Sequence, residues 1–287
     1  MQMLFDHHTH SCHSFDGSEP IEALAEAAVS RGLHALAVTD HCDLGLQCLP
    51  DWEERLSGSM EEISKNRAAF QGRLTLLAGI ELGQPLHDLQ RAADVLVRFP
   101  CDLVIGSLHN LRETEDFYFL QDAGADPQVL LDRYFDELLE MTRWGGFDIL
   151  AHLTYPYRYL GYTDTPPITC FEEKLREIFT SLARGGKALE LNTSGLVRSP
   201  GGNAAVNSSR SARTRTAPRM WAAESAKGLS CCAQQASAIR RLSRGAALRP
   251  SRFDPKGGIL WIRPAQSESS AGRMDPPPSS LPHVSLL

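Results

Sequence analysis

The chain has 287 residues, of which 42% are apolar and 22% are charged, an ordinary composition for a globular protein of one large or two small domains. The formal net charge of −6 is unevenly divided, because residues 1–197 carry 15 basic and 31 acidic side chains whereas residues 198–287 carry 14 and 4. No run approaches the roughly 20 apolar residues that cross a bilayer, and the N-terminus lacks the basic and apolar regions of a signal peptide. We therefore expect a cytoplasmic protein without a membrane partner.

From residue 1 to about residue 195, short apolar runs alternate with longer segments of helical period, a pattern typical of βα units around a mainly parallel sheet. One predicted helix spans Pro20–Arg31, with Ser18 as its N-cap, and another spans Pro127–Trp144 and ends at two glycines. Six such units form most of a barrel. The predicted strands are Met3–His8, Ala35–Thr39, Leu74–Ile80, Asp102–Ser107, Asp148–His152 and Ala188–Asn192.

The alternating pattern stops after Leu196. Stretches rich in Gly, Ser, Arg and Pro follow it and close the chain, and their composition predicts disorder, while Met220–Leu248 could form a basic helix with few large apolar residues. We therefore divide the chain into a barrel, residues 1–197, and a basic low-complexity tail, residues 198–287. A basic tail also raises the option of nucleic-acid binding, but no aromatic residues are interleaved with its arginines, so we expect no such partner.

Potential metal ligands stand at or just after the ends of five predicted strands. Because all strands of a βα barrel point the same way, these side chains should meet at its C-terminal rim, where barrel enzymes place their active sites. His8 and His10 project to the same side of their strand, since side chains alternate along a strand. The residues at the five strand ends are His8 and His10, Asp40 and His41, Glu81, His109, and His152.

The side chains expected at this rim suit zinc, iron or manganese, and a glutamate with two oxygens can bridge two such ions. Bound metals can hold a phosphate and lower the pKa of bound water to about 7, so phosphoester hydrolysis is the natural chemistry of such a site. The seven cysteines, by contrast, are scattered and include no CxxC pair, which predicts neither a disulfide framework nor a thiolate zinc site.

Six motifs in a fixed order make the chain resemble the PHP (polymerase and histidinol phosphatase) superfamily, histidinol-phosphatase type, over residues 3–196. They are DHHTHSCHSFDG, AVTDHCD, AGIELG, DLVIGSLH, DILAHLTYPYRY and ALELNTSG. The resemblance implies an α/β fold, a distorted (β/α)7 barrel of the TIM-like kind, with up to three divalent metals, that hydrolyses L-histidinol phosphate in histidine biosynthesis. By match to the motifs, one metal would be held by His8, His10 and Glu81, a second by Glu81, His109 and His152, and a third by Asp16 and His41.

The tail departs from this family. A seventh strand ending in a GSDxH-like motif should supply two further ligands, yet Asp254 and Asp275 are each followed by proline, and His283 lies in a Pro/Ser-rich end. We therefore expect an incomplete barrel of about six units, with fewer metals than the family holds. We hypothesise that the tail is a frameshifted or replaced reading, and an intact frame across codon 198 in an independent isolate would contradict this.

Several residues beside the expected ligands have alternative interpretations. Asp40 is expected to orient a ligand from behind, and Asn192 to support a ligand or the substrate. Arg158 is expected to contact the substrate phosphate, with stacking on a neighbouring tyrosine as the alternative. Asp16 lies in an FDG turn, where aspartate is also common for local backbone hydrogen bonding. His41 follows an acid and is alternatively a structural histidine oriented by Asp40.

The predicted function is a metal-dependent phosphomonoesterase acting on L-histidinol phosphate, a small-molecule substrate, with Glu81 and Arg158 as catalytic residues. One alternative is another PHP phosphoesterase, acting on nucleotide ends or phosphotyrosine. The other is a catalytically impaired remnant that still binds metal but lacks the last ligands. The sequence leaves the oligomeric state open.

Overall fold

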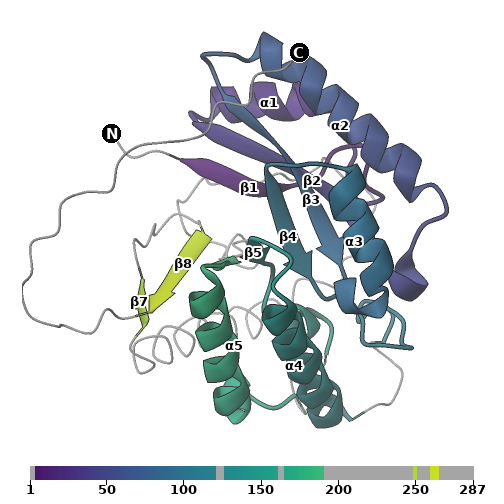
Figure 1. The fold of residues 1–287 in the computed structure, drawn as a ribbon, viewed down its shortest axis with the longest axis vertical. Coiled ribbons are helices and arrows are strands. Elements are labelled where there is room, and N and C mark those ends of the chain that lie inside the picture. Colours follow the sequence, from purple (N-terminus) through teal and green to yellow (C-terminus); the bar gives the residue numbers. More distant parts are fainter. Residues whose placement is uncertain (1–3, 121–125, 161–164, 191–247, 251–258, 265–287) are drawn as a thin grey trace, which may run out of the picture.

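A computed structural model describes residues 4–120, 126–160, 165–190, 248–250 and 259–264. Six parallel strands, paired in chain order, curl into a half-barrel that has helices packed against it (Figure 1). This α/β architecture confirms the fold class predicted from the sequence. The strands are β1 (Phe5–Thr9), β2 (Ala35–Asp43), β3 (Thr75–Gly83), β4 (Leu103–Ser107), β5 (Ile149–Leu150) and β6 (Ala188–Glu190).

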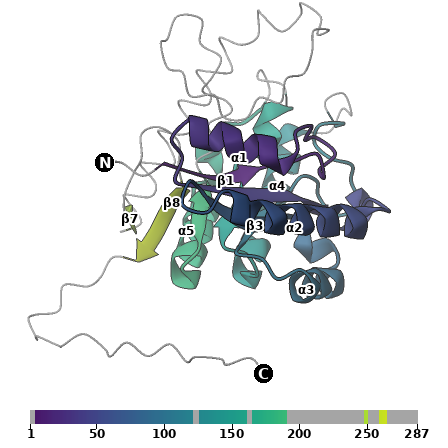
Figure 2. The ribbon, with the colours of Figure 1, turned by 90° about the horizontal axis from the view of Figure 1, so that it is seen from above.

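Each pair of successive strands is joined by one α-helix, as βα units require. Helices α1 and α2 lie side by side against β2 and β3 (Figures 1 and 2). The predicted helix Pro127–Trp144 is found with the same bounds. The helices are α1 (Ile21–Ser30), α2 (Trp52–Ala69), α3 (Leu89–Arg98), α4 (Pro127–Trp144) and α5 (Glu172–Gly185), and the short 3-10 turns are η1 (Gly45–Gln47), η2 (Pro85–His87), η3 (Tyr155–Arg158) and η4 (Ile168–Phe171).

The predicted Ser18 cap of α1 is wrong. Pro20 occupies the N-cap position, and no side chain of the cap residue hydrogen-bonds there. Instead, the backbone N–H of Ile21 donates to Oε1 of Glu62 in α2, 2.8 Å away. A carboxylate from a neighbouring helix therefore satisfies a donor that a local serine would ordinarily take.

Strands β2 and β3 form the longest pairing of the described sheet. Their register is unbroken from Ala35↔Thr75 to Asp43↔Gly83, and both strands are buried along almost their whole length. Apolar side chains from α1, α2 and α3 cover one face of them, including Ile21, Ile63 and Val95. The C-terminal halves of β2 and β3 are thus well fixed for carrying functional groups.

The end of the sheet beyond β6 differs from the expectation. Sequence analysis predicted no strand after Asn192, but β8 (Ile259–Pro264) pairs antiparallel with β6, and β7 (Leu248–Pro250) pairs with β8. The run ILWI consists of apolar residues, two of them β-branched and one aromatic, which favours a strand. Of the predicted basic helix only Leu248 is described, as the first residue of β7, and both low-complexity stretches lie outside the described residues. Within the described residues, no helix is long and apolar enough to cross a bilayer.

Candidate metal centre

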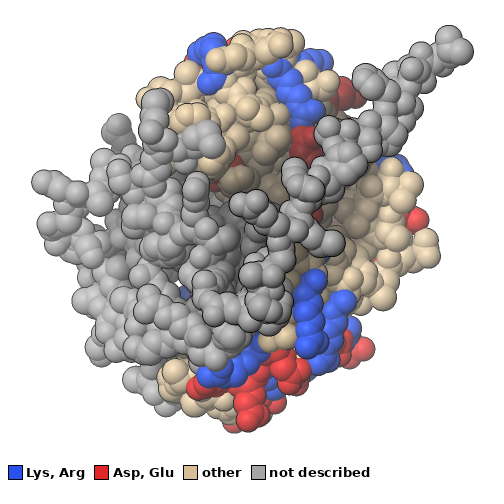
Figure 3. Space-filling model, turned by 60° about the vertical axis from the view of Figure 1, so that its left-hand side comes forward, with Lys and Arg blue, Asp and Glu red and all other residues tan. Residues whose placement is uncertain are grey.

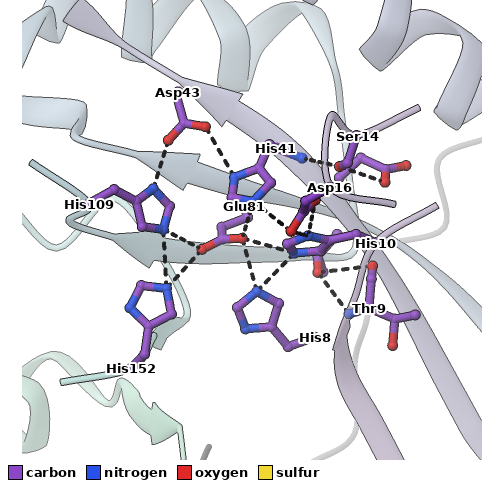
Figure 4. Close-up of polar contacts among 12 residues, drawn as sticks. His8, Thr9, His10, Ser14, Asp16, His41, Asp43, Glu81, His109 and His152 are labelled. Carbon is purple, nitrogen blue, oxygen red and sulfur yellow. Dashed lines mark hydrogen bonds and ion pairs between the residues drawn. The ribbon is translucent and has the colours of Figure 1, made fainter. Parts of the chain in front are cut away.

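Glu81 lies at the centre of a cluster of five histidines at the C-terminal ends of the strands (Figure 4). Its carboxylate is 1% exposed. Each oxygen meets ring nitrogens from different strands, so one side chain joins both halves of the cluster. Oε2 is 2.9 Å from Nε2 of both His8 and His10 and 3.5 Å from Nε2 of His41, whereas Oε1 is 3.2 Å from Nε2 of His109 and 3.1 Å from Nε2 of His152.

The parallel sheet explains this convergence. His41 and Glu81 are register partners on β2 and β3, so their side chains leave the sheet together. His109 and His152 follow the last residues of β4 and β5, which end at the same edge. Residues spread over more than half of the chain therefore meet because parallel strands share one C-terminal edge.

Three carboxylates surround the histidines from outside. Asp43 Oδ1 is 2.8 Å from His109 Nδ1, and its Oδ2 is 3.1 Å from His41 Nδ1. Glu190 Oε1 is 2.8 Å from His8 Nδ1, and Asp16 Oδ1 is 2.9 Å from His10 Nδ1. A carboxylate opposite Nδ1 favours a proton on that nitrogen, which leaves the Nε2 lone pair directed at Glu81.

The donor set fits divalent metal ions. Nε2 of His8 and Nε2 of His10 lie 3.1 Å apart, so two neutral rings whose Nδ1–H groups donate to carboxylates would direct two lone pairs at each other beside the negative Glu81. A cation between them relieves this repulsion. Imidazole and carboxylate are suitable ligands for zinc, iron or manganese. Three groups have ligand atoms within 4.8 Å of one another: His8, His10 and Glu81; His10, Asp16 and His41; and His41, Glu81 and His109.

The ionisation of the cluster follows from burial and from its mixed charges. Burial alone would raise the pKa of Glu81, but His41 and His8 hold it well below its usual range. Burial alone would lower the pKa of His109, but Asp43 raises it to about 9. His152 behaves differently, because burial lowers its pKa to about 4. Without metal, the carboxylates therefore depend on protonated histidines for charge balance.

The loop after β1 is fixed by Asp40, which accepts hydrogen bonds from the backbone N–H and Oγ of Ser11 (2.6 and 2.7 Å), Oγ of Ser14 (2.9 Å) and Oγ of Ser59 (2.6 Å). Ser14 in turn accepts the backbone N–H of His41 at 2.9 Å. Asp40 thus holds the loop that leads to Asp16, and its own oxygens contact serines.

The model of the PHP domain matches residues 6–194. The chain belongs to the PHP domain family. The histidine cluster lies wholly within this match, whereas β7 and β8 lie beyond it.

The same part of the chain is similar to histidinol-phosphatases. The histidinol-phosphatase of Lactococcus lactis is 28% identical over 194 residues, which cover 66% of this chain and 71% of that protein. A probable histidinol-phosphatase of Deinococcus radiodurans is 29% identical over 205 residues, covering 68% and 75%. The solved structure of the Lactococcus lactis enzyme, complexed with zinc, L-histidinol and phosphate, superposes with a TM-score of 0.57, covering 66% of this chain and 73% of that one.

The PHP domain brings together the seven predicted ligands, and Arg158 is not one of them. Arg158 is exposed, and its guanidinium lies 5.7 Å from the ring centre of Tyr155. That ring is 5.0 Å from the ring of His109 and 4.9 Å from the ring of His152, so Arg158 lies beside the cluster. Asn192 is outside the described residues.

Sequence reasoning missed Asp43 and Glu190. Asp43 stands two residues after His41 in DHCD, and strand alternation could have placed both on one side of β2. Glu190 ends β6, two residues before the predicted Asn192. In both cases the strand ends at a residue other than the predicted one. β2 continues past Thr39 to Asp43, whereas β6 ends at Glu190 before it reaches Asn192.

Proposed function

We propose that this PHP-domain protein is a metal-dependent phosphomonoesterase that hydrolyses L-histidinol phosphate to L-histidinol and phosphate. The observation that carries the proposal is the convergence of five histidines on the buried Glu81. It is supported by the named relatives, one of which is solved with zinc, L-histidinol and phosphate. We include a cytoplasmic location, because a biosynthetic phosphatase must meet its substrate where that substrate is made.

The residues that would hold metal are the three ligand groups described above together with His152, whose Nε2 is 3.1 Å from Glu81 Oε1. Bound divalent ions, whether zinc, iron or manganese, would supply an activated water and neutralise phosphate charge. Glu81 would serve as a ligand shared between ions, and this role is supported by its two oxygens, each of which faces a different set of histidines. Asp43 and Glu190 would keep the rings in their binding orientation.

Arg158 would orient the phosphate of the substrate. Its guanidinium is exposed and adjacent to Tyr155, whose ring lies against His109 and His152. A planar guanidinium can bind phosphate through two hydrogen bonds. We expect the loss of this arginine to raise KM by a larger factor than the factor by which it lowers the metal content of the protein.

One observation favours a second candidate, a metal-binding protein with impaired turnover. Strand β8 runs antiparallel beside β6, and neither β7 nor β8 contains a histidine or a carboxylate. The described part of the tail therefore adds no ligand to the cluster, in contrast to the family pattern expected from the sequence.

The decisive experiment measures metal content and phosphate release on the same purified full chain. The substrates are L-histidinol phosphate, nucleoside monophosphates and phosphotyrosine. We expect a clear preference for L-histidinol phosphate and loss of both metal and activity in Glu81→Gln, but not in the matched surface variant Glu140→Gln. Preference for either other substrate class would refute the substrate choice. One metal per chain with no turnover would support the second candidate.

A further inference from the structure

A second cluster of metal-binding side chains lies outside the histidine centre. Cys12, His13 and Glu62 offer ligand atoms that all lie within 4.8 Å of one another. The first two belong to the loop after β1, and Glu62 belongs to α2. None of the three belongs to the ligand groups around Glu81.

The geometry holds these side chains together without a metal. His13 Nε2 is 2.9 Å from Glu62 Oε2. The His13 ring lies so close to α2 that a Cβ added at Gly58 would stand 2.7 Å from its Cε1 atom. A glycine inside a helix costs about 1 kcal/mol relative to alanine, and here it makes room for the imidazole. The ring is therefore seated against α2.

The backbone of the loop is fixed as well. Cys12 N–H donates to the Glu19 carbonyl at 2.9 Å, and the Arg55 guanidinium donates to the His13 carbonyl at 3.4 Å. Glu62 Oε1 accepts the Ile21 N–H, and this bond keeps Oε2 directed at His13 Nε2. A carboxylate whose second oxygen is already bonded is a pre-oriented ligand.

We propose that Cys12, His13 and Glu62 bind one zinc-class divalent ion, with solvent at the fourth position. Thiolate, imidazole and carboxylate are the ligands that zinc takes in proteins, usually in tetrahedral geometry. Cys12 is exposed, and the side chains of His13 and Glu62 are 23% and 26% exposed, so an ion has a path to the site. Such an ion would tie the loop that leads to Asp16 to helix α2.

Cobalt(II) provides the test, because a cobalt–thiolate bond gives a charge-transfer absorption that histidine and carboxylate ligands do not. The three ligand groups around Glu81 contain no cysteine, so the histidine centre does not contribute to this absorption. We expect metal-stripped full chain to develop the band on cobalt titration and Cys12→Ser to lose it, with one cobalt fewer per chain. His13→Ala and Glu62→Gln should weaken cobalt binding at this site by more than about tenfold.

Matched controls separate this site from other thiols. Cys170→Ser removes another exposed cysteine that is not part of a ligand group, and a Cys231→Ser/Cys232→Ser double variant removes the adjacent pair in the tail; both should keep the band. Absence of the band in the wild-type chain, or its persistence in Cys12→Ser, would overturn the proposal. Loss only in Cys12→Ser, with His13→Ala and Glu62→Gln unchanged, would overturn the three-ligand site.

Discussion

At the scale of single residues, two sets of carboxylates contact the histidines of the centre, one set at Nε2 and the other at Nδ1. Glu81 faces the Nε2 atoms, whereas Asp43 and Glu190 face Nδ1 atoms from behind. In the proposed metal centre the inner carboxylate would provide charge for a cation, and the outer ones would keep Nε2 of His8, His41 and His109 free to bind it. The residues that would bind a metal are thus different from the residues that would orient the histidine rings.

Asp43→Asn should weaken metal retention by about 10- to 100-fold, the effect typical of residues that orient metal-binding histidines. The amide loses the negative charge that two rings contact, His109 at 2.8 Å and His41 at 3.1 Å. Competition with a chelator, read by metal analysis, measures the change. The exposed Asp132→Asn, on α4, is the control. Equal retention in both variants would contradict an orienting role for Asp43.

Glu190 predicts an acid-dependent loss of stability in the metal-free protein. Burial alone would raise the pKa of Glu190, but His8 lowers it from 4.5 to about 2. Because the folded-state pKa lies below the ordinary value, the stabilisation is present above pH 4.5 and is lost as the pH falls toward 2. At about 1.4 kcal/mol per pKa unit, the full contribution is about 3 kcal/mol.

Urea unfolding of metal-stripped wild type and Glu190→Gln measures this contribution. The difference in unfolding free energy should be largest near pH 6 and should shrink as the pH is lowered below 4.5. The surface variant Glu177→Gln, which loses an exposed ion pair with Arg143, should show little difference at any pH. A gap between wild type and Glu190→Gln that is independent of pH would contradict the assignment.

At the scale of elements, the register of β2 and β3 builds the outer shell of the centre. Asp43 and Gly83 are register partners at the ends of these strands. A Cβ at Gly83 would stand 2.0 Å from Asp43 Oδ1 and 3.3 Å from His109 Nδ1. The missing side chain of Gly83 therefore leaves the space in which the aspartate reaches the histidine.

Gly83→Ala should displace Asp43 and lower metal affinity by at least about tenfold, with a loss of stability of about 1–3 kcal/mol from overpacking. Isothermal titration with zinc and urea unfolding measure the two effects. Gly185→Ala is the matched control, since an added Cβ there meets only the Lys187 side chain, at 3.3 Å. An unchanged zinc affinity in Gly83→Ala would contradict the prediction, because it would show that zinc binding does not depend on the position of Asp43.

Most elements could be predicted from the sequence, but the ends of several strands could not. Apolar runs located all six parallel strands, and α4 begins at Pro127 and ends before the two glycines, as predicted. However, β2 continues to Asp43 and β3 to Gly83, past the end of their apolar runs. Parallel pairing supplies hydrogen bonds to polar residues there, which a hydrophobic pattern does not reveal.

At the scale of the whole molecule, charge is distributed differently in the two parts of the sequence. On the α4–α5 face, basic and acidic side chains are interleaved (Figure 3), with Lys174 beside Asp132 and Asp136 and Arg143 beside Glu177. Exposed pairs of this kind each contribute about 0–1 kcal/mol. We propose that the barrel ends and the tail begins near residue 197, because the composition of the chain changes there from acidic to basic.

Limited trypsin digestion tests this boundary. From the composition, we expect the first cleavages at arginines between Arg198 and Arg219. Because β8 pairs with β6, the two fragments should elute together in size-exclusion chromatography and separate only in denaturant. Protection of these arginines would contradict the boundary, and separation without denaturant would contradict a stable β6–β8 pairing.

The sequence by itself determined that histidines and carboxylates gather at one edge, because ligand-type residues close successive strands and parallel strands share their C-terminal edge. Only the tertiary structure decided which groups face which nitrogen. His8 meets Glu190 across 182 residues, and His13 meets Glu62 across 49. Such contacts depend on strand register and helix packing. Because Glu62 reaches the proposed site of Cys12 and His13 only through helix packing, a search of the sequence for CxxC pairs could not find this site.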